Sequence, residues 1–341
     1  MLAEMVRSVG NSCGFEMVGI APVEPPDYDR YQQWVADGMA ADMHYLTDHR
    51  ADLRRDVRSL LPEARSVICV GKLYNAPPPD RVVNPDLANI SRYAWGQDYH
   101  EVMRASMTDM VEQLRSLEDF QWRICVDTAP VLERSLARTA GLGWIGKNTC
   151  LINEPLGSWF FLGEIITSLD LAPSLPPPDR CGTCTRCIDA CPTDALVPNG
   201  DQWTLDSRRC ISYFTIEHRG SIPELIRADL GDHVFGCDIC QDVCPWNRRA
   251  PVTADPAFAA NPVTLQELAA MDQPAFRERY RGTPVVRAKH AGILRNVAVA
   301  MGNSSAESYR EELEALAQHA EPLVREHAEW ALSPLSVTKA D

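Results

Sequence analysis

The sequence predicts three segments of different architecture: an α/β domain over residues 1–172, a cysteine-rich domain over residues 173–250 and a helical domain over residues 251–335. Strand-like apolar runs alternate with helix-like patterns in the first segment. Eight of the twelve cysteines lie between Cys181 and Cys244, and prolines flank that stretch on both sides. The rest of the chain is helical in pattern, and prolines begin two of its helices.

The composition is that of a globular protein, with 45% hydrophobic and 23% charged residues among 341, which excludes disorder over most of the chain. No run of about 18 apolar residues is present, and the N-terminus lacks the apolar core of a signal peptide. We therefore expect a cytoplasmic protein with no membrane partner, in a compartment where clustered thiolates favour metal over disulfides. On average, a net charge of −14 argues against a nucleic-acid partner.

In the first segment, buried strands are predicted at Met17–Ala21, Ser66–Gly71 and Arg123–Val126, where apolar residues run together. Helices are predicted at Tyr99–Leu117 and Val131–Ala140 from apolar residues at helical spacing. This alternation of strands and helices is typical of an α/β domain.

A glycine-rich motif follows the second of these helices. Gly141, Gly143 and Gly146 match the G-x-G-x-x-G pattern of dinucleotide-binding loops. That interpretation needs a strand before the motif and a helix after it, whereas a helix precedes it here. We predict instead that Gly141 ends the helix in a left-handed conformation. The other glycines then form a tight turn or let the backbone approach a flat ligand.

Asp127 directly follows the third predicted strand. Ligands of open α/β sheets bind beyond the carboxyl ends of strands, so Asp127 is a candidate proton donor beside a bound cofactor. That role needs a partly desolvated carboxyl that stays neutral near neutral pH. Asp127 also fits the N-cap of the next helix, and the two interpretations are compatible.

The clustered cysteines have the spacing of iron–sulfur ligands. The run C-x2-C-x2-C-x3-C-P over 181–192 is the pattern of bacterial ferredoxins, in which the fourth cysteine binds the other cluster. A second run over 237–245 lacks one ligand, which Cys210 can supply. Structural zinc is the alternative, because C-x2-C pairs also form tetrahedral sulfur sites. Two [4Fe–4S] clusters are predicted, one on Cys181, Cys184, Cys187 and Cys244 and the other on Cys191, Cys210, Cys237 and Cys240. The isolated cysteines are predicted to be small buried hydrophobic residues: Cys13, Cys69, Cys125 and Cys150.

The C-terminal segment combines helical repeats with a basic stripe. Helices at Pro284–Met301, Glu307–His319 and Pro322–Leu332 resemble repeat hairpins that are too few to stand alone and should pack against the rest of the chain. The stripe from 277 to 295 carries +5, which leaves −19 for the remaining chain. Such a stripe contacts a phosphate backbone or is only a solvated helix face. Its cations are Arg277, Arg279, Arg281, Arg287, Lys289 and Arg295.

Taken together, these motifs resemble the epoxyqueuosine reductases, which are cobalamin-dependent iron–sulfur enzymes of tRNA modification. The resemblance covers nearly the whole chain, from Gly14 to about Leu332. The stretches that carry it are Ser91–His100, Asp127–Arg134, Ala140–Asn148, Gly157–Glu164, Arg209–Tyr213 and Cys237–Asn247.

The resemblance implies a cobalamin-binding α/β domain, a ferredoxin-like domain with two [4Fe–4S] clusters and a C-terminal α-helical HEAT-like repeat that contacts tRNA. It implies reduction of the epoxide of epoxyqueuosine to an alkene at the tRNA wobble position, the last step of queuosine synthesis, with Asp127 as the proton donor. Thr128 stands where serine is common in the family. By resemblance, the cobalamin contacts are Arg54, Asp127, Asn148, Leu151, Leu162 and Ser212, and the substrate contacts are Tyr99, His100 and Arg134.

The partners implied are the anticodon stem-loop of a tRNA and an external electron donor, and we expect a monomer. Arg287, Lys289 and Arg295 of the basic stripe are the candidate tRNA contacts. No D-x-H-x-x-G motif for a histidine ligand to cobalt is present, because Met103 occupies the glycine position. Two alternatives remain: a cobalamin iron–sulfur reductase of a small molecule, as reductive dehalogenases are, and a non-enzymatic ferredoxin-type electron carrier.

Overall fold

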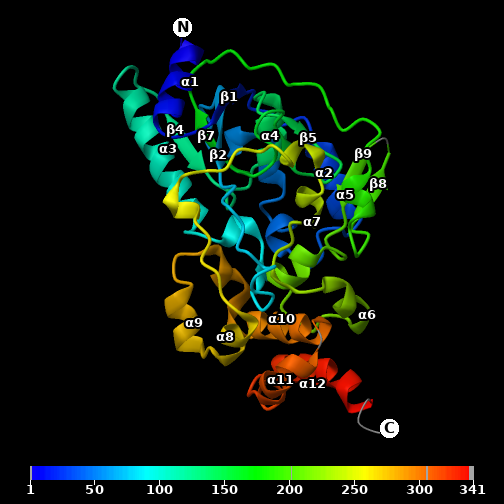
Figure 1. Cartoon of the computed structure of the whole chain (residues 1–341). Helices are drawn as coiled ribbons and strands as arrows, with labels where there is room; N and C mark the ends of the chain where they lie inside the picture. The colour runs from blue at the N-terminus through cyan, green and yellow to red at the C-terminus, as the bar shows by residue number, and fades with distance from the viewer. Residues whose placement is uncertain (1, 201, 305, 338–341) are drawn as a thin grey trace.

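The computed structural model describes residues 2–200, 202–304 and 306–337 (Figure 1). Its centre is a four-stranded sheet in the order β1-β2-β7-β4. The strands are β1 (Met17–Ala21), β2 (Ser66–Leu73), β7 (Phe160–Thr167) and β4 (Trp122–Cys125). The three predicted strands are confirmed, but every neighbouring pair is antiparallel. The sheet is therefore not the parallel kind to which the strand-end rule applies, although β2 and β4 run in the same direction on either side of β7.

Helices cover both faces of this sheet. On one face, α1 (Leu2–Ser12) and α3 (Tyr99–Arg115) pack their apolar stripes, with the methionines of α3 among them, against the β2 and β7 side chains. On the other face, α4 (Glu133–Thr139) packs Leu136 against alternate residues of the same strands. Burial from both sides explains why β2 and β7 are mostly apolar on both faces, with Glu164 as an exception in β7.

The cysteine-rich segment is built from short elements. They are α5 (Arg186–Asp189), β8 (Leu196–Asn199), β9 (Gln202–Leu205), α6 (Glu224–Arg227), β10 (His233–Phe235) and α7 (Ile239–Asp242). Many contacts join this segment to the first. For example, α2 (Tyr28–Ala36) donates the Trp34 indole N–H to the Leu205 carbonyl at 2.7 Å, and β3 (Asn89–Ile90) pairs with β10 in parallel. The segments on either side of the predicted boundary at 172 therefore pack closely against each other in the fold.

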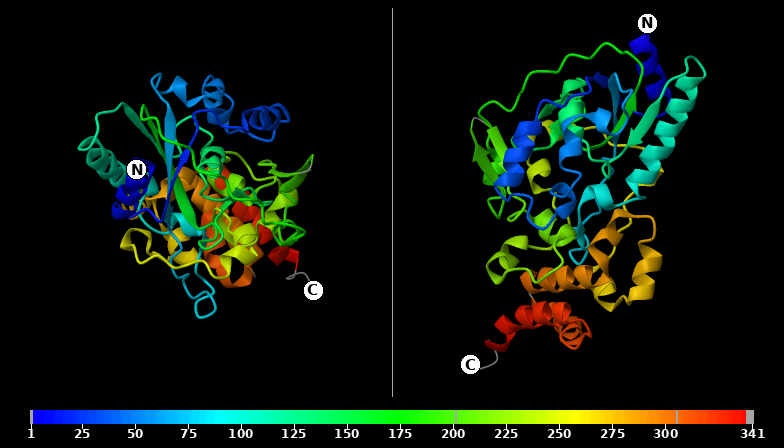
Figure 2. Two further views of the ribbon diagram at one scale, coloured as in Figure 1. Left: turned by 90° about the horizontal axis from the view of Figure 1, so that it is seen from above. Right: turned by 180° about the vertical axis from the view of Figure 1, so that it is seen from behind.

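The C-terminal helices lie at the end of the molecule opposite the N-terminus (Figures 1 and 2). They are α8 (Leu265–Ala270), α9 (Gln273–Arg279), α10 (Lys289–Asn303), α11 (Arg310–Leu316) and α12 (Pro322–Val337). As predicted, Pro284 and Pro322 begin helical segments, and the helices share a core with residues of earlier segments such as Ala94 and Phe235. Whether these hairpins are HEAT-like repeats stays a prediction.

Arg295 of α10 does not lie on the surface. It is 1% exposed, and its guanidinium donates to the carbonyls of Phe214, His218 and Gly220 at 2.6–2.9 Å and to the side chain of Asn296. Those bonds occupy its donors and join α10 to the cysteine-rich segment. The prediction that Arg295 contacts tRNA is therefore wrong, because the side chain turns inward.

Among the described residues, no helix is both long enough and apolar enough to cross a membrane.

Candidate active site and cysteine sets

Asp127 lies two residues beyond β4 in a left-handed backbone conformation, with φ of +52°. Its side chain is 48% exposed. The next helix, α4, begins six residues later at Glu133, and the N-cap position is Leu132, which has no side-chain capping bond. The N-cap interpretation of Asp127 is therefore wrong. Instead, the backbone N–H of Asp127 donates to Oε1 of Glu133 at 2.5 Å.

His100 stands between two carboxylates. Its Nε2 lies 3.3 Å from Oδ2 of Asp127, and its Nδ1 lies 2.7 Å from Oδ1 of Asp98. Asp98 is the N-cap of α3 and also accepts the backbone N–H of His100 at 3.0 Å. The start of α3 thus fixes the imidazole in orientation and aims it at Asp127.

The charges around Asp127 favour its ionised form, whereas the sequence predicted a neutral carboxyl. Burial by itself would raise the pKa of Asp127, but the hydrogen bond and charge of His100 and the charge of Arg287 lower it overall. Burial would lower the pKa of His100, and the two carboxylates raise it overall. Both shifts favour an ionised Asp127 beside a protonated His100, which corrects the expectation of a neutral Asp127.

Two further side chains complete the surroundings of Asp127. Tyr99 stacks on Phe161 with ring centroids 4.3 Å apart and on His100 at 4.1 Å. Burial and the charge of Asp127 raise the pKa of the Tyr99 hydroxyl far above its usual range. Arg287, which comes from the C-terminal segment, pairs with Glu217 at 2.5 Å. Its influence on the pKa of Asp127 was not anticipated, since the sequence marked Arg287 only as a phosphate contact.

The eight clustered cysteines separate into two groups. Burial raises the pKa of Cys187 to about 11, and its neighbouring thiols are Cys181, Cys244 and Cys184. The second group has its own apolar surroundings, shared by Cys210 and Cys237 with residues of α7. Burial raises the pKa of Cys210 and of Cys237, and the thiol of Cys191 raises both further. The pKa of Cys240 is raised first by a contact with the Cys150 thiol and by burial, and then by the thiols of Cys237 and Cys210. This grouping matches the two predicted ligand sets.

The surroundings of the first set fit a sulfur-rich group. Cys181 and Cys244 pack with Trp144, whose buried indole N–H has no hydrogen-bond partner in the part of the chain that the structure describes. Such a donor can bind a cluster sulfur, and hydrogen bonds of this kind tune cluster potentials. Within the described part of the chain, no three Cys, His, Asp or Glu side chains converge as ligands of a single metal ion do. A four-iron cube, by contrast, holds each thiolate on a separate iron.

The isolated cysteines differ among themselves. Cys69 and Cys125 are fully buried, as predicted, and Cys13 is half-buried. Cys150 is half-buried too, and its thiol contacts that of Cys240, a member of the second set. Sequence spacing could not reveal this contact, because 90 residues separate the two thiols.

Two of the predicted cofactor contacts lie beside the second cysteine set. The Nδ2 of Asn148 donates to the Cys240 carbonyl at 3.2 Å, and the Ser212 hydroxyl contacts the thiol of Cys210. Leu151 is buried, and Leu162 is half-buried against the same apolar cluster on the α4 side of the sheet. Asn148 and Ser212 therefore lie beside the second set, whereas Leu151 and Leu162 lie in the apolar cluster against the sheet.

The other predicted contacts have different surroundings. Arg54 is 7% exposed and donates to the carbonyls of Arg50 and Tyr45 at 3.0 and 3.1 Å. These bonds stabilise the backbone of residues 45–54. Arg134 is exposed and donates to the Thr149 carbonyl.

The glycine-rich motif packs against the protein itself. Gly141 has φ of +82°, which confirms the left-handed helix end. Two short strands then pair, β5 (Trp144–Ile145) and β6 (Leu151–Ile152). A Cβ on Gly143 would lie 2.2 Å from the Ile152 carbonyl oxygen. The close approach that requires this glycine is therefore to β6, and the absence of a helix after the motif agrees with the rejection of a dinucleotide site.

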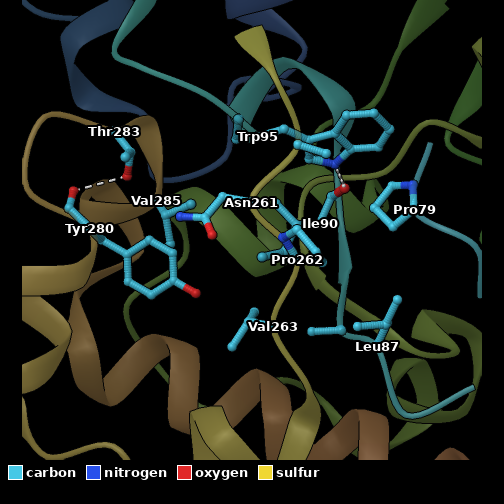
Figure 3. A pocket seen from close by; sticks show the side chains of 13 residues that line it. Pro79, Leu87, Ile90, Trp95, Asn261, Pro262, Val263, Tyr280, Thr283 and Val285 are labelled. Carbon is cyan, nitrogen blue, oxygen red and sulfur yellow. Dashed lines mark hydrogen bonds between the residues drawn. The ribbon is translucent and has the colours of Figure 1, made fainter. Parts of the chain in front are cut away.

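A small pocket lies elsewhere, between the β3 region and the C-terminal helices (Figure 3). Its volume of about 30 Å³ suits a single water molecule, and the buried Tyr280 hydroxyl on its wall has no hydrogen-bond partner among the described residues. It shares no residue with the Asp127 site.

The fold and the site together define an iron–sulfur oxidoreductase with an acid group at the edge of its sheet. A model of the 4Fe-4S double cluster binding domain matches residues 180–247, and a model described as epoxyqueuosine reductase QueG, DUF1730 matches residues 54–128. The chain belongs to the epoxyqueuosine reductase family.

Relatives and solved structures support that assignment over almost the full length. The chain is 42% identical to the epoxyqueuosine reductase of Xanthomonas campestris pv. campestris, over 97% of this chain and 95% of that protein. It is 40% identical to that of Pseudomonas aeruginosa, over 97% and 94%. A crystal structure of epoxyqueuosine reductase with a tRNA-Tyr epoxyqueuosine-modified stem loop superposes with a TM-score of 0.87 at 29% identity, over 96% of this chain and 88% of that chain.

Proposed function

We propose that the protein reduces epoxyqueuosine in tRNA to queuosine. The observation that carries the proposal is the likeness, over 96% of the chain, to an epoxyqueuosine reductase solved with its modified stem loop. The site has the chemistry that such a reaction needs, since an acid pair lies at one end of the sheet and the chain carries a 4Fe-4S double cluster binding domain. We expect the reaction to occur in the cytoplasm, because tRNA is its substrate and free thiolates need a reducing compartment.

The reaction takes up two electrons and two protons. The two carbon–oxygen bonds of the epoxide break, a carbon–carbon double bond forms and the oxygen leaves as water. An alkoxide is a poor leaving group, so a positioned acid must protonate the oxygen. Asp127 is that acid, and it draws its proton from His100 at 3.3 Å. Tyr99 and Arg134 are the candidate contacts to the modified base.

Cobalamin is the cofactor implied by the family resemblance. The residues that would hold it are Asp127, Asn148, Leu151, Leu162 and Ser212, of which Asn148 and Ser212 contact members of the second cysteine set. Arg54 would act by supporting its own loop. When bound, cobalamin supplies a low-potential cobalt centre for reduction of the substrate. The two [4Fe–4S] clusters would relay single electrons from an external donor. We expect the protein to act as a monomer.

The C-terminal segment is the proposed tRNA-binding surface. Arg277 and Lys289 are exposed, and Arg287 is exposed although it is paired with Glu217. Arg279 and Arg281 have partners within the protein, at Pro262 and Glu278, and Arg295 is buried. The basic surface is therefore smaller than the charge count along the chain predicts.

Reversing Lys289 and Arg277 to Glu is expected to weaken tRNA binding and to reduce the slope of log affinity against log salt by about one per lost phosphate contact. Fluorescence anisotropy with a labelled anticodon stem-loop at several salt concentrations measures both quantities. The Arg65→Glu, Arg123→Glu double variant, at two exposed arginines near the sheet, is the control with the same change in net charge. Equal affinity for the double variant and the wild type would mean that the basic stripe is only a solvated helix face and does not contact tRNA.

The proposed function is tested by mass spectrometry of tRNA nucleosides after anaerobic incubation with epoxyqueuosine-tRNA, cobalamin and a low-potential reductant. We expect loss of one oxygen atom from the modified nucleoside. Unchanged nucleosides together with reduction of an added halogenated aromatic compound would favour the small-molecule reductase. Unchanged nucleosides and an unchanged cobalamin absorption spectrum would favour the electron carrier.

A further inference from the structure

Glu164 is a charged residue type in the middle of a buried strand. It is 0% exposed within β7, and in the antiparallel register it stands opposite Cys69 of β2 and Cys125 of β4. Directly opposed residues share a face of a sheet, so the three side chains form a row across the face that α4 covers. The sheet thus places a carboxyl group between two buried thiols.

Among the described residues, no cation pairs with the Glu164 carboxyl. Neither Oε1 nor Oε2 of Glu164 has a hydrogen bond of standard geometry within the described part of the chain. Burial raises its pKa well above the usual range, and the neighbouring carboxyls of Glu133 and Asp127 raise it further. An ionised carboxylate without a partner is costly in such a place, so Glu164 stays protonated at neutral pH.

Glu133 links this buried acid to the active site. It is the first residue of α4, it contacts Glu164, and its Oε1 accepts the N–H of Asp127 at 2.5 Å. The groups that act on it are Asp127 from the loop, Arg134 from α4 and His100 from α3. Burial, followed by the charge of Asp127, raises its pKa to about 8.

We propose that the half-buried Glu133 and the buried Glu164 form a proton-holding carboxyl pair that fixes the Asp127 loop and supplies the second of the two protons used in each reduction. This inference rests on the proposed function. His100 and Asp127 give the first proton to the departing oxygen, and Glu133 restores a proton to Asp127. The two electrons come from the external one-electron donor, and solvent reprotonates the pair after product release.

The first test uses isosteric amides. Glu133→Gln and Glu164→Gln keep the volume and the hydrogen-bond acceptor but release no proton, so kcat should fall about 10- to 100-fold while KM for tRNA and iron content stay unchanged. Glu101→Gln, an exposed residue of α3, is the control. If both buried amide variants turn over like the wild type, the pair has only a structural role and the proposal is overturned.

The second test does not depend on activity. An acid whose pKa is raised by folding binds more protons in the folded state, so the wild-type free energy of unfolding should fall as pH rises from about 4.5 to about 8. Glu133→Gln and Glu164→Gln remove that loss, and their thermal midpoints should rise relative to the wild type across this window. Curves that stay parallel to the wild type would mean that the carboxyls are ionised. If wild-type turnover itself is absent, the proposed function fails, and these curves still decide the state of the pair.

Discussion

Asp127→Asn is expected to lower kcat for epoxyqueuosine reduction by about 10²- to 10⁴-fold, with iron content and tRNA affinity unchanged. The amide keeps the shape of the side chain and its contact with His100, which lies 3.3 Å away, but it has no proton to give. Single-turnover mass spectrometry of tRNA nucleosides measures the loss directly. Asp119→Asn, an exposed residue at 91% side-chain exposure, is the matched control.

The pH dependence separates a proton donor from a residue that only shapes the loop. Asp127 and Asp98 raise the pKa of His100, so the wild-type rate should decline as pH rises through a value above 6.5 and the imidazole loses its proton. Removal of the Asp127 charge lowers the pKa of His100, and any residual rate should decline at a lower pH. Wild-type turnover with an unshifted profile would leave Asp127 without a catalytic role.

The elements of the fold were predictable where the signal is local. The apolar run Met17–Ala21 is a strand with those bounds, because burial from both sides leaves no polar position in it. The order and direction of the strands were not predictable, since pairing of β2 with β7 joins residues about a hundred positions apart. The helix predicted from Val131 begins at Glu133, because the Asp127 loop continues further than its apolar residues indicate.

The site follows the same division. A double-cluster domain was predictable from the sequence, because ligand spacing on a tight loop is a local property, and the assignment of each cysteine to a set stays a prediction. The inward turn of Arg295 and the charge of Arg287 near Asp127 depend on packing between distant segments, which a charge count does not contain. One signal was available but unused: Glu164 interrupts an otherwise apolar strand, and a buried charged residue type needs a reason.

Cys210→Ala is expected to remove one of the two clusters, so that bound iron falls from about eight to about four atoms per chain and turnover falls to background. Cys210 is the decisive ligand to test because it lies outside both C-x2-C runs and is assigned from its neighbours Cys191 and Cys237. Iron analysis and electron paramagnetic resonance of the reduced protein measure the remaining cluster. Cys13→Ala, a half-buried thiol outside both sets, is the control.

Cys150 provides a second thiol close to the second cysteine set, which matters if Cys210→Ala keeps both clusters. Its thiol contacts that of Cys240, so it can replace a missing ligand of the second set. Retention of both clusters in Cys210→Ala, followed by loss of one in the Cys210→Ala, Cys150→Ala double variant, would mean that Cys150 has taken over the vacant position. Retention of both clusters in the double variant would contradict the ligand set itself, because the second set would then have only Cys191, Cys237 and Cys240.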